Sequence, residues 1–208
     1  MKKYSYVGIA FIILIFGIYA IPKIVNKLKT PKLVVINKVP SFEFLNQDGK
    51  LISNSFYNDK VFVVEFFFTT CPTICPRMTE SMITIQNEFY AHQDFGIVSF
   101  SINPKHDTPE VLKQYAKDHG ATLKNWNFLT GEQDAIYELA NTGFTLFAGE
   151  NSNAEGGFEH SGMFALIDKE GYIRSRLDEF GNPIAFYDGL DPNGVKMIKE
   201  DIAILLKE

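Results

Sequence analysis

The chain has 208 residues, of which 46% are apolar, and its 20 basic and 25 acidic side chains give a formal net charge of −5. This length suits one domain of ordinary size plus an appendage, and the apolar fraction excludes wholesale disorder. With no basic stripe to neutralise a phosphate backbone, nucleic acid is excluded as a partner. Two cysteines are too few for a disulfide-rich miniprotein or a four-thiolate zinc site, so we expect them to act as a pair.

The N-terminal segment is apolar and then lysine-rich. Residues 4–21 contain no charged side chain, and a helix of that length spans about 27 Å, just enough to cross a bilayer. A cleaved signal peptide also begins with lysines, but its apolar stretch is shorter and ends in small residues, which this one lacks. We therefore predict an uncleaved transmembrane helix and a tether, together residues 1–32.

The orientation of this anchor depends on two opposing features. More lysines follow the apolar segment than precede it, which by the positive-inside rule alone would keep the remaining chain inside. The short N-terminal flank is instead typical of a signal anchor whose C-terminal domain is exported. Together with the thiol chemistry described below, this flank predicts a single-pass protein of the inner (cytoplasmic) membrane. Its soluble domain, residues 33–208, would face the periplasm.

Strands and helices alternate in the first half of the soluble part. Residues 42–45 predict a short strand, and the continuous apolar run at residues 61–68 predicts a central strand covered on both faces. A helix is expected over residues 76–90, because its apolar side chains recur at helical spacing. Residues 95–102 then predict a second apolar strand. The order is strand, helix, strand.

A second helix follows, with Asp107 or Thr108 as its N-cap, Pro109 at its first position and Gly120 beyond its end. A strand is predicted at residues 127–129. It is followed by a helix at residues 132–141, behind Thr130 and with Gln133 at the capping-box position. The last predicted elements are a hairpin around residues 168–171 and an amphipathic helix that begins at Asp191 and Pro192. This order is typical of an α/β sheet of the thioredoxin type. Ligands of such sheets bind at the carboxyl ends of the strands.

Both cysteines follow the predicted central strand directly. Cys71 and Cys75 thus fall in the loop and first helical turn beyond its carboxyl end. In helical geometry a spacing of four brings two side chains to one face, with Cβ atoms about 5 to 6 Å apart, so the pair can share one metal ion or form one disulfide. A helix N-terminus also favours the thiolate, the form that binds metal and attacks disulfides. Two buried cysteines or a structural disulfide are the simpler alternative, although a four-residue loop is a weak staple.

Four histidines could supply a third group to this pair. His92 and His119 lie near the ends of predicted helices and His106 lies in a polar turn, so each is expected to be solvated or to cap a helix. His160 differs, because it follows a polar, glycine-rich loop and precedes the strand of the later hairpin. We expect the loop, residues 149–157, to be mobile, since it offers little apolar area to bury. A surface histidine remains the alternative interpretation of His160.

Three stretches carry a family resemblance: CPTIC followed by PRM, INPKHDTPEVLKQY, and HSGMFALIDKEGYIRSR. Together they are similar to the Sco/SenC family of membrane-anchored copper proteins, and the likeness runs over most of residues 36–206. The resemblance implies a thioredoxin-like fold and a copper site made by both cysteines of a CxxxC motif and one distant histidine, which correspond to Cys71, Cys75 and His160. Family members commonly have Asp where this chain has Thr73 and Asn103.

The resemblance also implies a role and partners. It implies delivery of copper to, or reduction of the thiols of, the binuclear copper site in subunit II of cytochrome c oxidase. Two thiolates and one imidazole can hold Cu(I) and, with an open position, Cu(II), whereas structural zinc would want a fourth protein ligand. Met78 and Met163 are interpreted as core residues. We therefore predict a metallochaperone rather than an enzyme, which depends on a thiol reductant of the thioredoxin-like class.

The main alternative is a thiol-disulfide oxidoreductase without metal, because Cys71 and Cys75 can also form a redox-active disulfide and reduce cysteines of a partner. Thioredoxin-like reductases resemble one another in a CxxC motif and a cis-proline. This chain has three residues between its cysteines and no proline from residue 143 to 182. A peroxidase would need a polarising side chain beside the thiolate, and Arg77 can equally be a helix-surface cation. A purely structural interaction module would not need the cysteines.

Overall fold

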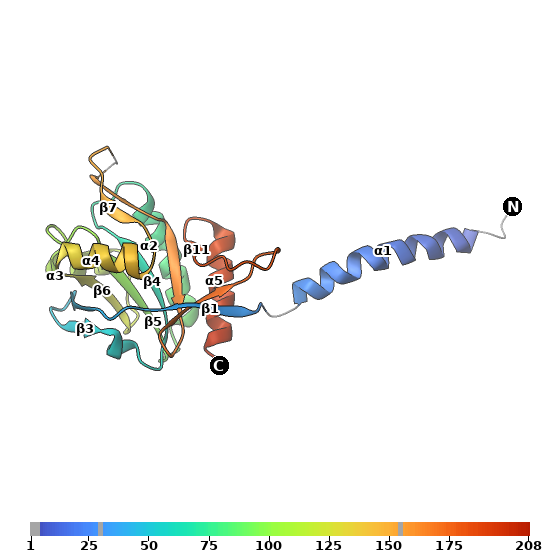
Figure 1. Cartoon of the computed structure of the whole chain (residues 1–208), viewed down its shortest axis with the longest axis horizontal. Helices are drawn as coiled ribbons and strands as arrows, with labels where there is room; N and C mark the ends of the chain where they lie inside the picture. Colours follow the sequence, from blue (N-terminus) through green and yellow to red (C-terminus); the bar gives the residue numbers. More distant parts are fainter. Residues whose placement is uncertain (1–4, 29–30, 154–155) are drawn as a thin grey trace. The chain divides into compact units, whose positions relative to one another are not determined.

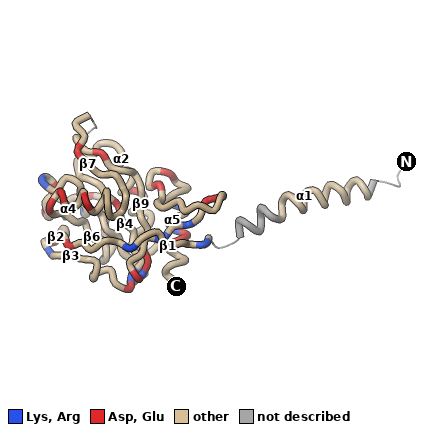
Figure 2. Tube along the Cα trace, viewed as in Figure 1, with Lys and Arg blue, Asp and Glu red and all other residues tan. Residues whose placement is uncertain are grey.

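The computed structural model describes residues 5–28, 31–153 and 156–208, and the chain divides into two compact units, Met1–Lys32 and Leu33–Glu208. The first unit contains helix α1 (Ser5–Leu28), drawn in blue in Figure 1. Over residues 7–21, where side chains are described, the large apolar side chains are exposed. Figure 2 shows no charged residue along this stretch. No helix in the described part of the chain combines the length and apolar character needed to cross a bilayer. Residues 1–4 and 29–30 of the predicted anchor and tether lie outside the described residues.

The second unit is built on a mixed sheet of the thioredoxin-like kind (Figure 1). Within its described residues the strand order is β1-β10-β9-β4-β5-β6-β2-β3, and β11 pairs with β9. The strands are β1 (Leu33–Lys38), β2 (Glu43–Asn46), β3 (Leu51–Ser53), β4 (Val61–Phe67), β5 (Phe95–Ser101), β6 (Trp126–Thr130), β9 (Met163–Ile167), β10 (Tyr172–Arg176) and β11 (Tyr187–Asp188). Strands β4, β5 and β6 run parallel, and the other pairings are antiparallel.

The two central strands are buried along their whole length, which accounts for their continuous apolar runs. Neighbouring side chains of β4 point to opposite faces of the sheet. Phe67 packs on Tyr115 of α3 (Pro109–Asp118), whereas Phe66 packs on Phe144, just beyond the segment that follows α4 (Gln133–Glu138). Helices α3 and α4 therefore cover opposite faces of the sheet.

Helix α2 (Ile74–Phe89) lies on the same face as α3, because the hydroxyl of Thr79 hydrogen bonds to that of Tyr115 at 2.7 Å. Helix α5 (Pro192–Leu205) contacts α2 and is capped by Asp191, as the sequence predicts. Thr108 rather than Asp107 caps α3, with its hydroxyl accepting from the backbone N–H of Val111. Asp107 has another role, described below.

Two predictions for the second half of the chain are wrong in detail. The helix expected at residues 132–141 is α4, which ends at Glu138 and continues as a π-helical turn, η2 (Leu139–Gly143). Its N-cap is Glu132, and Gln133 bonds to side chains of Tyr137 and Glu150 instead of closing a capping box. The expected loop, residues 149–157, overlaps the end of a short strand, β7 (Ala148–Glu150), and connects it to a second one, β8 (Phe158–His160), with which β7 pairs antiparallel. A 3₁₀ turn, η1 (Asn54–Tyr57), precedes β4.

Candidate metal centre

The two cysteines lie where the central strand gives way to α2. Cys75 is in the first turn of α2, whereas Cys71 precedes the helix, in a turn closed by a 3.3 Å hydrogen bond from its N–H to the carbonyl of Phe68. Their position at the carboxyl end of β4 is the one predicted from sequence. Helical spacing, however, does not explain how they meet, because only Cys75 is helical. The turn from Phe68 to Cys71 brings the first sulfur back toward the second.

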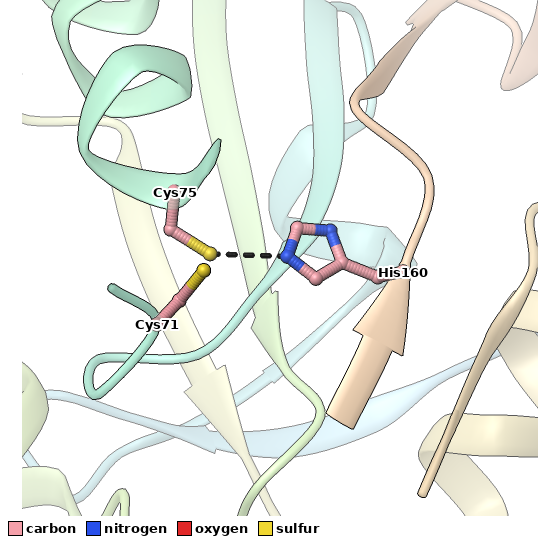
Figure 3. Close-up of side chains that lie close together, drawn as sticks. All are labelled: Cys71, Cys75 and His160. Carbon is pink, nitrogen blue, oxygen red and sulfur yellow. Dashed lines mark hydrogen bonds between the residues drawn. The ribbon is translucent and has the colours of Figure 1, made fainter. Parts of the chain in front are cut away.

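His160 reaches this pair from the small sheet. It is the last residue of β8 and pairs with Ala148 of β7. Its Nδ1 lies 3.1 Å from the carbonyl oxygen of Ser161, and because a carbonyl only accepts, Nδ1 carries the proton. Its Nε2 therefore presents a lone pair, 3.0 Å from Sγ of Cys75 (Figure 3).

A glycine accounts for the close approach of this segment to the cysteine turn. Gly156 has φ +85°, and a Cβ at that position would lie 2.9 Å from the ring of Phe68 and 3.4 Å from Pro72. The ring of Phe68 in turn meets the imidazole of His160 edge to face, with centroids 5.8 Å apart. The glycine-rich composition thus permits backbone contact with the site.

The three side chains form one compact, buried cluster. One ligand atom from each of Cys71, Cys75 and His160 lies within 4.8 Å of the other two. Cys71 is 8% exposed, Cys75 1% and His160 7%. Two sulfurs and one imidazole nitrogen converging in a nearly dry site are the donors that a soft or borderline metal prefers.

The protons of the thiol pair are held unequally. The interaction with Cys75 stabilises the thiolate of Cys71 and, against the effect of burial, lowers the pKa of Cys71 to about 3. The same interaction, together with burial, raises the pKa of Cys75. The expectation that both cysteines are more ionised than a free thiol therefore holds for Cys71 and is wrong for Cys75. Of the two thiols, Cys71 is therefore the readier to ionise, and a metal ion that binds both sulfurs must displace the proton of Cys75.

The other histidines lie outside the cluster, as expected. His92 and His106 are half exposed, beside Asp94 and Asp107 respectively. His119 is the C-cap of α3. His92 and His119 have the solvated or capping roles that their sequence positions predict, whereas His106, although half exposed, also hydrogen bonds to the buried carboxylate of Asp107.

The remaining residues singled out in the sequence have structural roles. Thr73 is the N-cap of α2, and its hydroxyl lies 3.7 Å from the sulfur of Cys71. The carbonyl of Asn103 accepts the backbone N–H groups of His106 and Asp107. The guanidinium of Arg77 donates to the carbonyl of Leu190, and Met78 is buried in the core.

Two buried acids near the site were missed by sequence reasoning. Asp107 is fully buried and binds Thr69, two residues before Cys71. Glu65, also buried, is on β4 and hydrogen bonds to Ser99 of β5. The signal for Glu65 was present, since it is the one charged residue in the apolar run at residues 61–68.

The chain is similar to known proteins over most of this unit. The SCO1/SenC family model matches residues 34–191. The SCO1 protein homolog of Bacillus subtilis is 36% identical over 138 residues, which cover 65% of this chain and 71% of that protein.

Two solved structures share the fold. The SCO1/SenC family lipoprotein of Bacillus anthracis superposes with a TM-score of 0.71 at 31% identity, covering 81% of this chain and 95% of that one. BsSco superposes with a TM-score of 0.69 at 30% identity, covering 87% and 98%. BsSco is described as a member of the Sco family of cytochrome c oxidase assembly proteins in which a disulfide switch was identified.

Proposed function

The chain belongs to the SCO1/SenC family, and we propose that it binds one copper ion through Cys71, Cys75 and His160 and passes it on during assembly of cytochrome c oxidase. The observation that carries this proposal is the buried cluster, whose three ligand atoms lie within 4.8 Å of one another. The membership of BsSco among oxidase assembly proteins supports the destination of the metal.

The donor set fits copper better than zinc. Two thiolates and an imidazole satisfy Cu(I) in three-coordinate form, and an open fourth position accommodates Cu(II) or a ligand from a partner. A structural zinc site would use four protein ligands. Copper is the cargo of this site. The chain's own contribution is to present Nε2 of His160 to the sulfurs, with Nδ1 fixed on the carbonyl of Ser161.

The recipient we propose is the binuclear copper site in subunit II of cytochrome c oxidase. Transfer requires that the donor release one ligand while another still holds the ion, because free copper would be lost to solvent. His160 is suited to be released first, since it comes from a separate small sheet, whereas Cys75 is fixed in α2. This ligand order places the thiols as the last contacts of the ion.

A second candidate function, reduction of a partner's disulfide, is favoured by the low pKa of Cys71. A thiolate at neutral pH is the nucleophile of disulfide exchange, and Cys75 stands beside it to resolve the mixed disulfide. The disulfide switch described for BsSco is in line with such chemistry in the family. The resulting Cys71–Cys75 disulfide would then need a thiol reductant of the thioredoxin-like class.

We also propose that residues 1–32 anchor the chain in the inner membrane, with residues 33–208 in the periplasm. Support comes from the uncharged stretch at residues 4–21 and from the exposed apolar side chains along the described part of α1. A thiol pair that cycles between dithiol and disulfide suits an oxidising compartment. The relative from Bacillus anthracis is a SCO1/SenC family lipoprotein.

Copper stoichiometry and absorption spectra of the reduced full chain test the metal site. We expect one copper per chain and, with Cu(II), a sulfur-to-copper charge-transfer band. Cys71→Ser should abolish the band and weaken binding. Ser81→Ala, on the same helix but outside the cluster, is the control. An unchanged spectrum and affinity in Cys71→Ser would overturn the assignment.

A further inference from the structure

A buried carboxylate holds together the three chain segments that meet behind Cys71. Asp107 is fully buried and lies just before the N-cap of α3. Its Oδ2 accepts the hydroxyl of Ser101, at the end of β5, at 2.5 Å. Its Oδ1 lies 2.8 Å from Nδ1 of His106. An acid buried this completely is retained only when donors satisfy both oxygens.

The remaining two donors come from a single residue of the cysteine turn. Thr69 donates its backbone N–H to Oδ2 of Asp107 at 3.0 Å and its hydroxyl to Oδ1 at 2.5 Å. Thr69 stands two residues before Cys71, whose own N–H bonds back to Phe68. The turn is thus fixed at its start by Asp107 and closed at its end on Phe68.

We infer that Asp107 is a positioning residue for the thiol pair: by gripping Thr69 on both its backbone and its side chain, it sets where Sγ of Cys71 lies relative to Cys75. Hydrogen bonds to a carboxylate are stronger than hydrogen bonds between neutral groups, so Thr69 is held in a fixed position. Without these hydrogen bonds the turn has more conformational freedom. Bringing the two sulfurs together into a disulfide then costs more conformational entropy.

The consequence is measurable without metal. Closing the disulfide joins the two sulfurs, and oxidised glutathione takes up the two electrons and two protons as two molecules of reduced glutathione. A loosened turn lowers the equilibrium constant of this exchange. We expect Asp107→Asn to lower it by about tenfold, equivalent to about 30 mV for a two-electron couple. An amide offers one acceptor oxygen and two donors, so it cannot replace a carboxylate that faces four donors.

Copper binding provides a second readout, and this part rests on the proposed function. Asp107→Asn should weaken copper binding by the full chain and shift the sulfur-to-copper band, because the ion needs both sulfurs in place. If the wild-type chain binds no copper, the proposed function is wrong. The glutathione equilibrium still decides the role of Asp107 in that case.

Three further variants separate positioning from general stability. Asp168→Asn makes the same chemical change at another buried carboxylate, one that binds the N–H groups of Glu170 and Tyr172 and the side chain of Arg174 in the β9–β10 turn. It should lower the melting temperature and leave the glutathione equilibrium unchanged. Thr69→Val removes only the hydroxyl donor and should shift the equilibrium by about threefold. Thr69→Ser keeps that donor and should stay within twofold of wild type.

These variants give clear outcomes. A shift in Asp107→Asn and Thr69→Val but not in Asp168→Asn or Thr69→Ser supports the inference. If Asp107→Asn fails to fold, the Thr69 pair gives the answer. An equilibrium constant within twofold of wild type in Thr69→Val and in any folded Asp107→Asn overturns it, as does an equal shift in Asp168→Asn.

Discussion

Nε2 of His160 lies 3.0 Å from Sγ of Cys75, although the two residues are 85 positions apart in the sequence. The sulfur is fixed by the first turn of α2 and the imidazole by the pairing of β8 with β7. Two elements that are far apart in the sequence thus meet at the carboxyl end of β4. Nδ1 donates to the carbonyl of Ser161, so Nε2 is the nitrogen that faces the sulfurs.

Replacing His160 with Ala should lower copper affinity by at least about tenfold, since loss of even a supporting hydrogen bond around a metal ligand costs about that much. The sulfur-to-copper band should also move, because one of three ligands has changed. Competition with a chelator of known affinity measures the first effect. His92→Ala removes a half-exposed imidazole beside Asp94 and serves as the control. Equal affinity in the two variants would exclude His160 as a ligand.

Sequence reasoning located the cysteines and His160 but not what holds them. The strand-to-helix position of the CxxxC motif follows from an apolar run and a helical period, both local patterns. The hydrogen bonds between Asp107 and Thr69 join residues 38 positions apart, and the sequence indicates Asp107 only as a possible cap of the helix that it precedes. Local patterns do not specify which distant donors a buried acid meets.

The two central strands of the main sheet were predictable from sequence, whereas the small separate sheet that carries His160 was not. Strands β4 and β5 are buried on both faces and show unbroken apolar runs. Strands β7 and β8 have three residues each and are partly exposed, so their composition reads as a loop. Their pairing, which carries His160, depends on packing against Phe68 rather than on strand propensity.

Replacing Tyr187 with Phe should destabilise the chain by about 1 to 3 kcal/mol. Its hydroxyl donates to Oδ2 of the fully buried Asp201 at 2.6 Å, and a hydrogen bond to a buried charge is costly to lose. Tyr90→Phe removes a hydroxyl at an exposed position and should cost little. Urea unfolding followed by circular dichroism measures both. Equal losses would show that the bond to Asp201 contributes nothing specific.

Stability should fall as pH rises through the titration of Glu65. Burial raises the pKa of Glu65 from 4.5 to about 7. The folded chain therefore binds this proton more tightly than the unfolded chain, so the contribution of Glu65 is fully present below pH 4.5 and is lost between pH 4.5 and about 7. The loss is on the order of 3 kcal/mol.

Glu65→Gln isolates this effect, because the amide keeps the size of the acid and does not titrate. The free energy of unfolding of wild type minus that of Glu65→Gln should decrease across this pH range and level off above it. Chemical unfolding at intervals of half a pH unit provides the difference curve. A flat curve would mean that the pKa of Glu65 is the same in the folded and the unfolded chain.

Reporter fusions should place the second unit in the periplasm. A reporter that is active only after export, joined after Lys32, should be active in cells, and one that is active only in the cytoplasm should not. Deleting residues 4–21 should reverse both results, because the apolar stretch is then missing. Activity of the cytoplasmic reporter in the intact fusion would show that the downstream lysines determine the orientation.

Oxidation should compete directly with copper. Closing the Cys71–Cys75 disulfide removes both thiolates and leaves His160 as a single imidazole, which cannot hold Cu(I) against solvent and cellular thiols. The oxidised full chain should therefore bind no stoichiometric copper until a dithiol reductant reduces the Cys71–Cys75 disulfide. The reductant is itself oxidised to a disulfide in this exchange. The reduced chain should bind one copper, and the bound ion should in turn slow oxidation of the pair, because linkage is reciprocal. Copper content of the oxidised, reduced and re-reduced chain after desalting provides the test, with Cys75→Ser as a form that cannot close the bond. If the oxidised and reduced chains take up equal copper, the sulfurs are not the ligands, and the cluster serves redox chemistry alone.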